Sequence, residues 1–227
     1  MKKEMVKNSF SAAAKTYDSV AKIQNLSSRE LVNLIDTPKI STVLDIGCGT
    51  GNTSLELYKK FPKADYTLCD LSENMLQEAS YKFPKEAQII CCDAEKYEFV
   101  ENYDLVIANL CVQWFEDLPK FVKKTKNHCS EFAFSTLLDK SFAFYRSCFD
   151  RPPTFDYPSA EELLNEIGPV KKFKIGHYSL EFENFFAVAR YFRKLGANLQ
   201  STKTPNTIKS QQKNPIILDY EIFFAIV

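Results

Sequence analysis

The sequence predicts a single α/β domain, built on a doubly wound sheet of seven strands with a helical lid inserted late in the chain. Three observations predict this fold. Short apolar strands alternate with helices of about ten residues through most of the first 136 residues. A cluster of glycines directly follows the first strand. The chain has 227 residues, which is long for one small domain and short for two, so we expect one domain, 1–227, with an insertion.

The first 38 residues are expected to be helical. Apolar side chains recur three and four positions apart between residues 8 and 36, with interruptions. Phe10, Tyr17 and Gln24 fall seven apart on one helical face. We expect this segment to cover the ligand site of the sheet, with Tyr17 facing the ligand. The alternative is a helix that simply packs against the core.

Residues 42–136 are expected to form the core of the sheet and its ligand site. Predicted strands are 42–46, 65–69, 87–92, 103–108 and 131–135. Predicted helices are 51–61, 72–83 and 118–127. Ser72 has the side chain of a helix N-cap, and Pro62 ends the helix before it. Strands joined by such helices form βαβ units, so these five strands should be parallel.

The pattern changes after residue 136. Residues 137–200 are rich in aromatic side chains and helical, apart from one extended stretch at 172–182. A polar tract follows, and the chain ends in a long apolar strand, 216–227. We expect the two extended stretches to form an antiparallel pair at the edge of the sheet. The helices around them would form the lid and the substrate insertion.

Charge and composition exclude some function classes. The chain is 45% hydrophobic and 14% aromatic, which suits a packed core. It carries 29 basic and 29 acidic residues, and its pI is near 6.7. A nucleic-acid-binding protein would show a basic stripe and a high pI, so no nucleic-acid partner is expected. The charged start of the chain and the lack of a long apolar run predict a cytoplasmic protein without a signal peptide or membrane span.

The seven cysteines are expected to be reduced thiols packed in the core. Their number is odd, none forms a CxxC pair, and most lie in apolar, strand-like runs. No histidine stands near them at ligand spacing, so no metal site is predicted. They are Cys48, Cys69, Cys91, Cys92, Cys111, Cys129 and Cys148.

The turn after the first strand is the main candidate for a ligand site. Three of the six glycines, Gly47, Gly49 and Gly51, fall within five residues of each other and open a helix. Glycine lets a backbone turn with positive φ and approach a ligand closely, and the helix offers free N–H groups. Asp45 stands two residues ahead, where a carboxylate would repel a pyrophosphate but suits a cationic amino group. A plain tight turn is the alternative.

Polar side chains follow the next strands of the predicted sheet in order. Asp70 ends the second strand, about twenty residues after the turn, where an acidic side chain accepts hydrogen bonds from ribose hydroxyls. Asp93 follows the third strand, placed to reach an adenine amine. Asn109 ends the fourth strand, with Gln113 soon after it. Ligands bind at the carboxyl ends of parallel strands in such sheets, so these side chains should share one site.

These segments resemble one family closely. The run from Val43 to Gly51 (VLDIGCGTG), followed by Asp70-Leu71-Ser72-x-x-Met75-Leu76, is similar to the class I methyltransferases that use S-adenosylmethionine (SAM) and release S-adenosylhomocysteine. The resemblance covers residues 42–136 and implies which residues bind SAM. The implied residues are Asp45, Gly47, Cys48, Gly49 and Gly51 near the methionine end, Asp70 and Leu71 at the ribose, Asp93 and Ala94 at the adenine, and then Asn109 and Gln113.

A narrower resemblance lies on both flanks. The pattern Phe10-x-x-Ala13-Ala14-x-x-Tyr17-Asp18, together with the Gln113-Trp114 pair, is similar to the malonyl-carrier-protein O-methyltransferases of biotin synthesis. This resemblance implies a malonyl thioester as methyl acceptor, carried on acyl-carrier protein or coenzyme A. Residues 201–214 are shorter and more polar than that family suggests. The alternatives are a methyltransferase of a polycarboxylic acid or quinone precursor, a non-catalytic SAM-binding subunit, and an RNA methyltransferase.

A malonyl acceptor would need a group that orients its carboxylate, and arginine binds carboxylates through two parallel hydrogen bonds. Arg146 is the first candidate and Arg151 the second, with Tyr17 as a further positioning group; Arg190 and Arg193 come after them. An internal ion pair is the alternative for Arg146. An ionised carboxylate needs no general base, which agrees with the distance of His128 and His177 from every motif. An acidic carrier protein could dock on lysines, although a solvated surface is the alternative for each. These lysines are Lys171, Lys172, Lys174 and Lys194.

Overall fold

The computed structural model describes residues 3–84, 86–149, 157–197 and 215–227. Its strands are β1 Thr42–Ile46, β2 Asp65–Asp70, β3 Gln88–Cys91, β4 Tyr103–Asn109, β5 Cys129–Leu137, β6 Lys172–Phe182 and β7 Ile216–Ile226. Its α-helices are α1 Lys3–Tyr17, α2 Lys22–Leu34, α3 Asn52–Lys60, α4 Glu73–Lys82, α5 Leu118–Lys126, α6 Ala143–Ser147, α7 Ala160–Ile167 and α8 Phe185–Leu195. Two short 3₁₀ helices are η1 Ala94–Lys96 and η2 Val112–Trp114.

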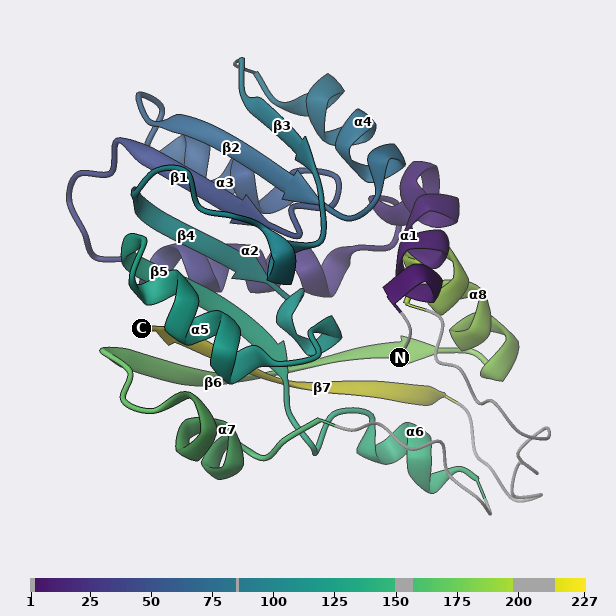
Figure 1. The fold of residues 1–227 in the computed structure, drawn as a ribbon. Helices are drawn as coiled ribbons and strands as arrows, with labels where there is room; N and C mark the ends of the chain where they lie inside the picture. Colours follow the sequence, from purple (N-terminus) through teal and green to yellow (C-terminus); the bar gives the residue numbers. More distant parts are fainter. Residues whose placement is uncertain (1–2, 85, 150–156, 198–214) are drawn as a thin grey trace.

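All seven strands join one sheet in the order β3-β2-β1-β4-β5-β7-β6, as Figure 1 shows. The first five strands are parallel to their neighbours, whereas β7 runs antiparallel to both β5 and β6. The predicted doubly wound, seven-stranded sheet is therefore confirmed. The predicted antiparallel pair also lies at the sheet edge, and β6 has the predicted bounds 172–182.

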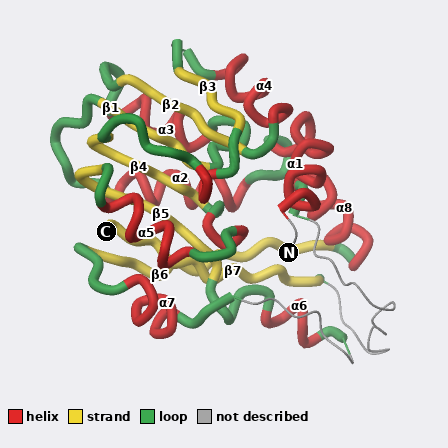
Figure 2. The backbone as a smooth tube through the Cα atoms, viewed as in Figure 1, coloured by secondary structure: helices red, strands yellow, loops and turns green. Residues whose placement is uncertain are grey.

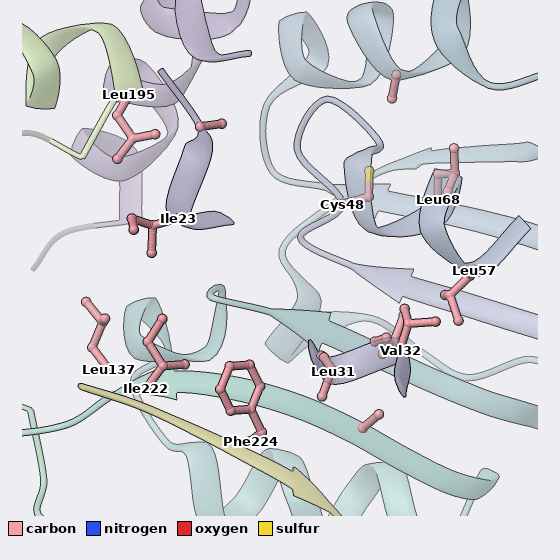
Figure 3. Packing of buried hydrophobic residues seen from close by; sticks show 14 of the residues in the cluster. Ile23, Leu31, Val32, Cys48, Leu57, Leu68, Leu137, Leu195, Ile222 and Phe224 are labelled. Atoms are coloured by element: carbon pink, nitrogen blue, oxygen red, sulfur yellow. The ribbon is translucent and has the colours of Figure 1, made fainter. Parts of the chain in front are cut away.

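Both faces of the sheet are covered, so alternate residues of each strand enter different cores. Val43 and Phe224 pack with α2, α3 and α8, whereas Leu44 and Phe223 pack with α5 and α7. Figure 2 shows the helices on the two sides of the sheet, and Figure 3 shows part of the first core, where Leu31 of α2 lies near β7. Such alternation is expected where a strand is buried on both faces.

The N-terminal segment differs from its prediction in one respect. One interrupted helical stretch was predicted for residues 8–36, but two separate helices form, and the first begins earlier, at Lys3. The break follows from side-chain bonds at its turn. Ser19 Oγ donates to the carbonyl of Thr16 at 2.6 Å, and Thr50 Oγ1 donates to Asp18 Oδ1 at 2.6 Å. These bonds end α1 and let the chain change direction before α2.

The helix after the glycine turn starts where Gly51 adopts a left-handed conformation, with φ of 82°. A Cβ at Gly51 would lie 3.2 Å from the Cβ of Ala79 in α4, so this glycine lets two helices pack closely. Ser72 caps α4 as predicted, since its hydroxyl accepts a hydrogen bond from the Met75 amide at 3.3 Å. These local features place the carboxyl ends of β1 and β2 beside each other.

Candidate active site

A cavity opens at the carboxyl ends of β1, β2, β3 and β4, and α1 covers part of it. The space between its lining residues is about 770 Å³ when the open mouth is included. We call it the first cavity. Its lining residues from the sheet side are Gly47, Gly49, Cys69, Asp70, Leu71, Ser72, Met75, Cys92, Asp93, Ala94, Asn109, Leu110, Cys111, Trp114 and Phe115, and those from α1 are Lys3, Val6, Lys7, Phe10 and Tyr17.

The glycine turn forms the floor of the first cavity next to β1. Gly47 has φ of +64°, and a Cβ there would lie 2.1 Å from Cys111 Sγ, so only glycine fits. Gly49 has φ of +55°, and no atom lies within 4 Å of the position that its Cβ would occupy. This open space beside bare backbone is what a closely bound ligand needs. Cys48 is buried behind the turn, and neither it nor Gly51 lines the cavity.

Asp70 joins the glycine turn to the end of β2. Its Oδ2 accepts a hydrogen bond from the Gly49 amide at 2.9 Å, and its Oδ1 accepts one from the Ser72 amide at 2.8 Å. Burial raises the pKa of this carboxyl, and the amide bonds oppose that shift. Each carboxylate oxygen has a second lone pair that can accept a ligand hydroxyl. Asp70 therefore has the position and chemistry predicted for a ribose contact.

Asp45 lies beneath the turn and not on the cavity surface. Its side chain is 1% exposed, its Oδ2 accepts a hydrogen bond from Ser54 Oγ at 2.5 Å, and its Oδ1 is buried without a partner. Burial raises the pKa of this carboxyl to about 7. Among the residues implied for SAM, Asp45 is thus separated from the cavity by the turn itself. Its unpartnered oxygen is the one group there that still requires a donor.

Asp93 and Ala94 line the far end of the first cavity, where the prediction put the adenine. Asp93 begins η1, and its side chain accepts a hydrogen bond from the Glu95 amide at 3.1 Å. Lys3 of α1 forms ion pairs with both Asp93, at 2.5 Å, and Glu95. Because Lys3 lies 90 positions from Asp93, this contact ties the N-terminal helix to the cavity.

Asn109 and Gln113, which were expected to share the SAM site, line different cavities. Asn109 lines the first cavity, but its Oδ1 accepts from Ser27 at 2.6 Å and from Ser135 at 2.7 Å. Its amide group donates to Ser28 Oγ at 3.0 Å and to the Gln24 carbonyl. Asn109 therefore holds α2 against the sheet. Gln113 lines a second cavity instead, where its Oε1 is buried without a partner.

The second cavity adjoins the first and encloses about 510 Å³ including its mouth. Both cavities share Phe10, Tyr17, Leu110 and Trp114 in their linings. The rings of Phe10 and Trp114 meet edge to face with centroids 5.7 Å apart, so they form part of the wall between the two cavities. The other lining residues of the second cavity are Gln24, Gln113, Leu137, Phe142, Tyr157, Phe192, Leu195, Ala197 and Tyr220.

Two residues of the second cavity have strained backbones. Leu110 and Phe142 have φ of 47° and 62°, and they are the non-glycine residues with positive φ in the described parts of the chain. Such a conformation costs on the order of 1–3 kcal/mol and persists where the surrounding fold imposes it, often at functional sites. Leu110 directly follows β4, and Phe142 precedes α6. The two strained residues therefore both lie in the wall of the second cavity, one after a strand and one before a helix.

Tyr17 lies at the end of α1 and faces both cavities, so the side chain points as predicted. Burial raises the pKa of its hydroxyl far above the ordinary value, and neighbouring acidic groups add to the shift. The Tyr17 hydroxyl therefore stays protonated near neutral pH. It can donate a hydrogen bond but cannot act as a general base.

The basic residues lie outside both linings, apart from Lys3 and Lys7. Arg146 is half-buried in α6, and its Nη2 donates to the carbonyl of Asp139 at 2.8 Å. Arg151 lies outside the described residues, and Arg190 and Arg193 are exposed on α8. Three of the four lysines considered for docking form ion pairs within the chain, which neither prediction included: Lys171 with Glu131, Lys172 with Asp36 and Lys174 with Glu30.

Histidines and metal ligands have no part in the described site. His128 stacks on Phe99 at 4.9 Å, and His177 lies in β6; neither lines a cavity. In the described ranges, no group of three His, Cys, Asp or Glu side chains is arranged to hold a metal ion. Across the same ranges, no helix has the length and hydrophobicity to span a membrane.

The prediction for the cysteines is right in part. All seven are free thiols, and Cys48, Cys69 and Cys148 are buried. Cys91 is exposed, because β3 is the edge strand of the sheet. Cys69, Cys92 and Cys111 line the first cavity, which the sequence pattern did not indicate. The contribution of Lys3, Val6 and Lys7 was also missed, because the predicted helical pattern began only at residue 8, whereas α1 begins at Lys3.

Comparison with known proteins shows which family this chain resembles. Residues 43–131 match the family model for a methyltransferase domain. The malonyl-[acyl-carrier protein] O-methyltransferase of Priestia megaterium is 35% identical, over 86% of this chain and 82% of that protein. The enzyme of the same name from Acetivibrio thermocellus is 28% identical, over 99% of this chain and 88% of its own.

Solved structures show the same fold at lower identity. A plantazolicin methyltransferase, crystallised with S-adenosylhomocysteine, is 19% identical and covers 97% of this chain, with 93% of its own length matched and a TM-score of 0.58. A putative methyltransferase of Bacillus halodurans is 15% identical, with a TM-score of 0.62 over 88% of this chain and 97% of its own. The cavity lies where class I methyltransferases bind SAM, at the carboxyl ends of the strands. The chain therefore belongs to the malonyl-[acyl-carrier protein] O-methyltransferase family of class I SAM-dependent methyltransferases.

Proposed function

We propose that this protein transfers a methyl group from SAM to the free carboxylate of a malonyl thioester, on acyl-carrier protein or on coenzyme A. The observation that carries the proposal is the relative of that name at 35% identity, which the chain matches over 82% of that protein's length. The product would be the malonyl methyl ester and S-adenosylhomocysteine, an early step of biotin synthesis in the cytoplasm.

The first cavity is proposed to hold SAM. Asp45, Gly47, Cys48, Gly49 and Gly51 would form the turn around the methionine end, Asp70 and Leu71 would hold the ribose, and Asp93 and Ala94 the adenine. The open space at Gly49 and the free lone pairs of Asp70 support this assignment. Bound SAM supplies an electrophilic methyl group on a positively charged sulfur. Asn109 would shape the wall of the first cavity by fixing α2. Gln113 would lie in the second cavity, on the other side of the shared wall.

The second cavity is proposed to receive the acyl carboxylate. It shares Phe10, Tyr17, Leu110 and Trp114 with the first cavity, so two ligands would meet at this wall. A malonyl carboxylate is already ionised near neutral pH, and the linings contain no histidine that would act as a base. Catalysis would then depend on holding the reactants in line and excluding water. The aromatic lining and the cover by α1 suit the exclusion of water.

Three groups are proposed to position the carboxylate. Tyr17 would donate a hydrogen bond from its hydroxyl, because burial raises the pKa of that group. Arg146 would supply the cation, which requires its guanidinium to leave the carbonyl of Asp139. Arg151 is the second candidate for that role. The helices of residues 137–200 would together form the lid on this side.

A substrate panel tests the proposal. The pure protein is incubated with SAM labelled in its methyl group and with malonyl-carrier protein, malonyl-coenzyme A, free dicarboxylic acids or a quinone precursor. We expect label on the malonyl thioesters, in a product that mild base hydrolyses as an ester. Label on free polycarboxylic acids or the quinone precursor alone would replace the proposal with a small-molecule methyltransferase.

A further inference from the structure

Two thiols lie side by side on the floor of the first cavity. Cys69 is the residue before the end of β2, and Cys92 directly follows β3. Parallel pairing places Cys69 opposite Ile90, and the Cys92 amide donates to the Asp70 carbonyl at 3.0 Å. The two sulfur atoms are 3.2 Å apart and share a hydrogen bond. The backbone therefore fixes this pair, since both residues belong to hydrogen-bonded strand ends.

The two thiols differ in access. Cys69 is fully buried at 0% exposure, whereas Cys92 is partly exposed, and both line the first cavity. The neighbouring Cys91 is exposed but does not line the cavity, and its sulfur contacts the carbonyl of Leu71 at 3.7 Å. A small oxidant that enters the cavity would thus meet Cys92 first, with Cys69 directly behind it.

We propose that Cys69 and Cys92 form an oxidation site, at which a peroxide converts the pair into an intramolecular disulfide on the cavity floor. In the first step the Cys92 thiolate attacks one peroxide oxygen, the O–O bond breaks, and a sulfenic acid and hydroxide form. In the second step the Cys69 sulfur attacks the Cys92 sulfur, the S–O bond breaks, and a second hydroxide leaves. Two thiols and one hydrogen peroxide give one disulfide and two water molecules.

The surroundings of Cys92 favour it as the attacking thiol. The hydrogen bond with Cys69 lowers the pKa of Cys92, and the Lys124 ammonium acts in the same direction. Burial and the carboxylates of Asp93 and Asp70 oppose that shift. A thiolate with access to solvent and a second thiol within reach is the usual arrangement of an oxidation-sensitive cysteine.

The disulfide would also change the cavity. The sulfurs are 3.2 Å apart, whereas a disulfide bond is about 2.05 Å long, so the side chains must rotate or the strand ends must shift to form it. The next residue after each cysteine is an acid of the cavity, Asp70 or Asp93. Oxidation should therefore weaken the binding of a ligand there. A ligand that covers Cys92 should in turn slow the oxidation, because the peroxide reaches Cys92 through the first cavity.

Mass spectrometry of the full chain tests the proposal. The reduced protein is treated with hydrogen peroxide, its remaining thiols are alkylated, and its intact mass and peptides are measured. We expect two fewer alkylations than in the untreated protein, a monomer, and a linked pair of peptides containing Cys69 and Cys92. Saturating S-adenosylhomocysteine should slow the reaction by about tenfold or more, because at about 100 times Kd little free protein remains.

Two matched variants and a binding measurement complete the test. Cys91→Ser should leave the disulfide unchanged, whereas Cys92→Ser should abolish it, and the two residues are adjacent. Calorimetry should show weaker S-adenosylhomocysteine binding after oxidation and full recovery after dithiothreitol. A disulfide that persists in Cys92→Ser, or that Cys91→Ser removes, would overturn the assignment. So would peroxide products that carry oxygen on both cysteines and no disulfide.

Discussion

Gly49 offers a sharp test of the cavity at the scale of one residue. Its left-handed backbone and the empty space beside it suggest that a side chain there would occupy the volume of the ligand. We expect Gly49→Val to abolish binding of S-adenosylhomocysteine, measured by calorimetry. Gly168→Val is the matched control, since Gly168 also has positive φ and open space but lies at the end of α7. Unchanged affinity in Gly49→Val would contradict the site.

The buried carboxyl of Asp45 should make the stability of the fold depend on pH. Burial raises its pKa from 3.8 to about 7, so the folded protein keeps a proton that the unfolded chain releases between these values. Stability from this group is therefore highest at low pH and is lost as pH rises toward 7. Asp45→Asn cannot ionise, and its amide oxygen can still accept from Ser54. Its stability relative to the wild type should rise with pH.

Urea unfolding of both proteins at about pH 5 and about pH 8 measures this difference. The free energy of unfolding of the variant, relative to that of the wild type, should increase between the two pH values. The increase should level off above the raised pKa of Asp45. A difference that stays constant with pH would mean that the Asp45 carboxyl titrates at its ordinary value.

Arg146 is the residue on which the acceptor proposal depends. We expect Arg146→Ala to lower kcat/KM for the malonyl substrate on the order of a hundredfold, from about 3 kcal/mol of lost charge-assisted hydrogen bonding. SAM binding should stay unchanged, because Arg146 does not line the first cavity. Arg29→Ala, an exposed arginine of α2, is the control. If kcat/KM is equal in both variants, the cation is supplied elsewhere.

At the scale of elements, deletion of α1 tests whether this helix serves mainly to cover the first cavity. It lines the first cavity through Lys3, Phe10 and Tyr17, whereas α2 contributes Ile23 and Leu31 to the core. Deleting residues 1–17 should therefore reduce SAM affinity and turnover while unfolding remains a single cooperative transition. Loss of folding would instead make α1 part of the core. The milder Lys3→Gln removes only the ion pairs and should weaken SAM binding to a smaller extent.

The elements that the sequence predicted well are those with local signals. Alternation of apolar strands and helices predicted the parallel core, and the extended stretch 172–182 predicted β6 with its observed bounds. The break after Tyr17 was not located, because it depends on Asp18 contacting Thr50, far along the chain. The pairs Lys3–Asp93 and Cys69–Cys92 are equally long-range, and no periodicity in a single sequence signals them.

For the whole molecule, sequence and structure agree on the position of the first cavity, at the carboxyl ends of the parallel strands. The glycine turn and Asp70 were predictable, because glycine spacing and strand ends carry their own chemistry. The second cavity was not, since its lining comes from α1, η2, β5, α8 and β7, which only the complete fold brings together. The sequence therefore indicates the donor site directly and the acceptor site only through resemblance.

The central claim is that the acceptor is a carboxylate on a thioester, and the mass of the carrier protein tests it most directly. Malonyl-carrier protein and acetyl-carrier protein are each incubated with the enzyme and SAM, and their intact masses are measured. Malonyl-carrier protein should gain the mass of one methylene group, and the acetyl form, which lacks the free carboxylate, should gain nothing. Equal behaviour of the two carriers, whether both are methylated or neither is, would contradict the account.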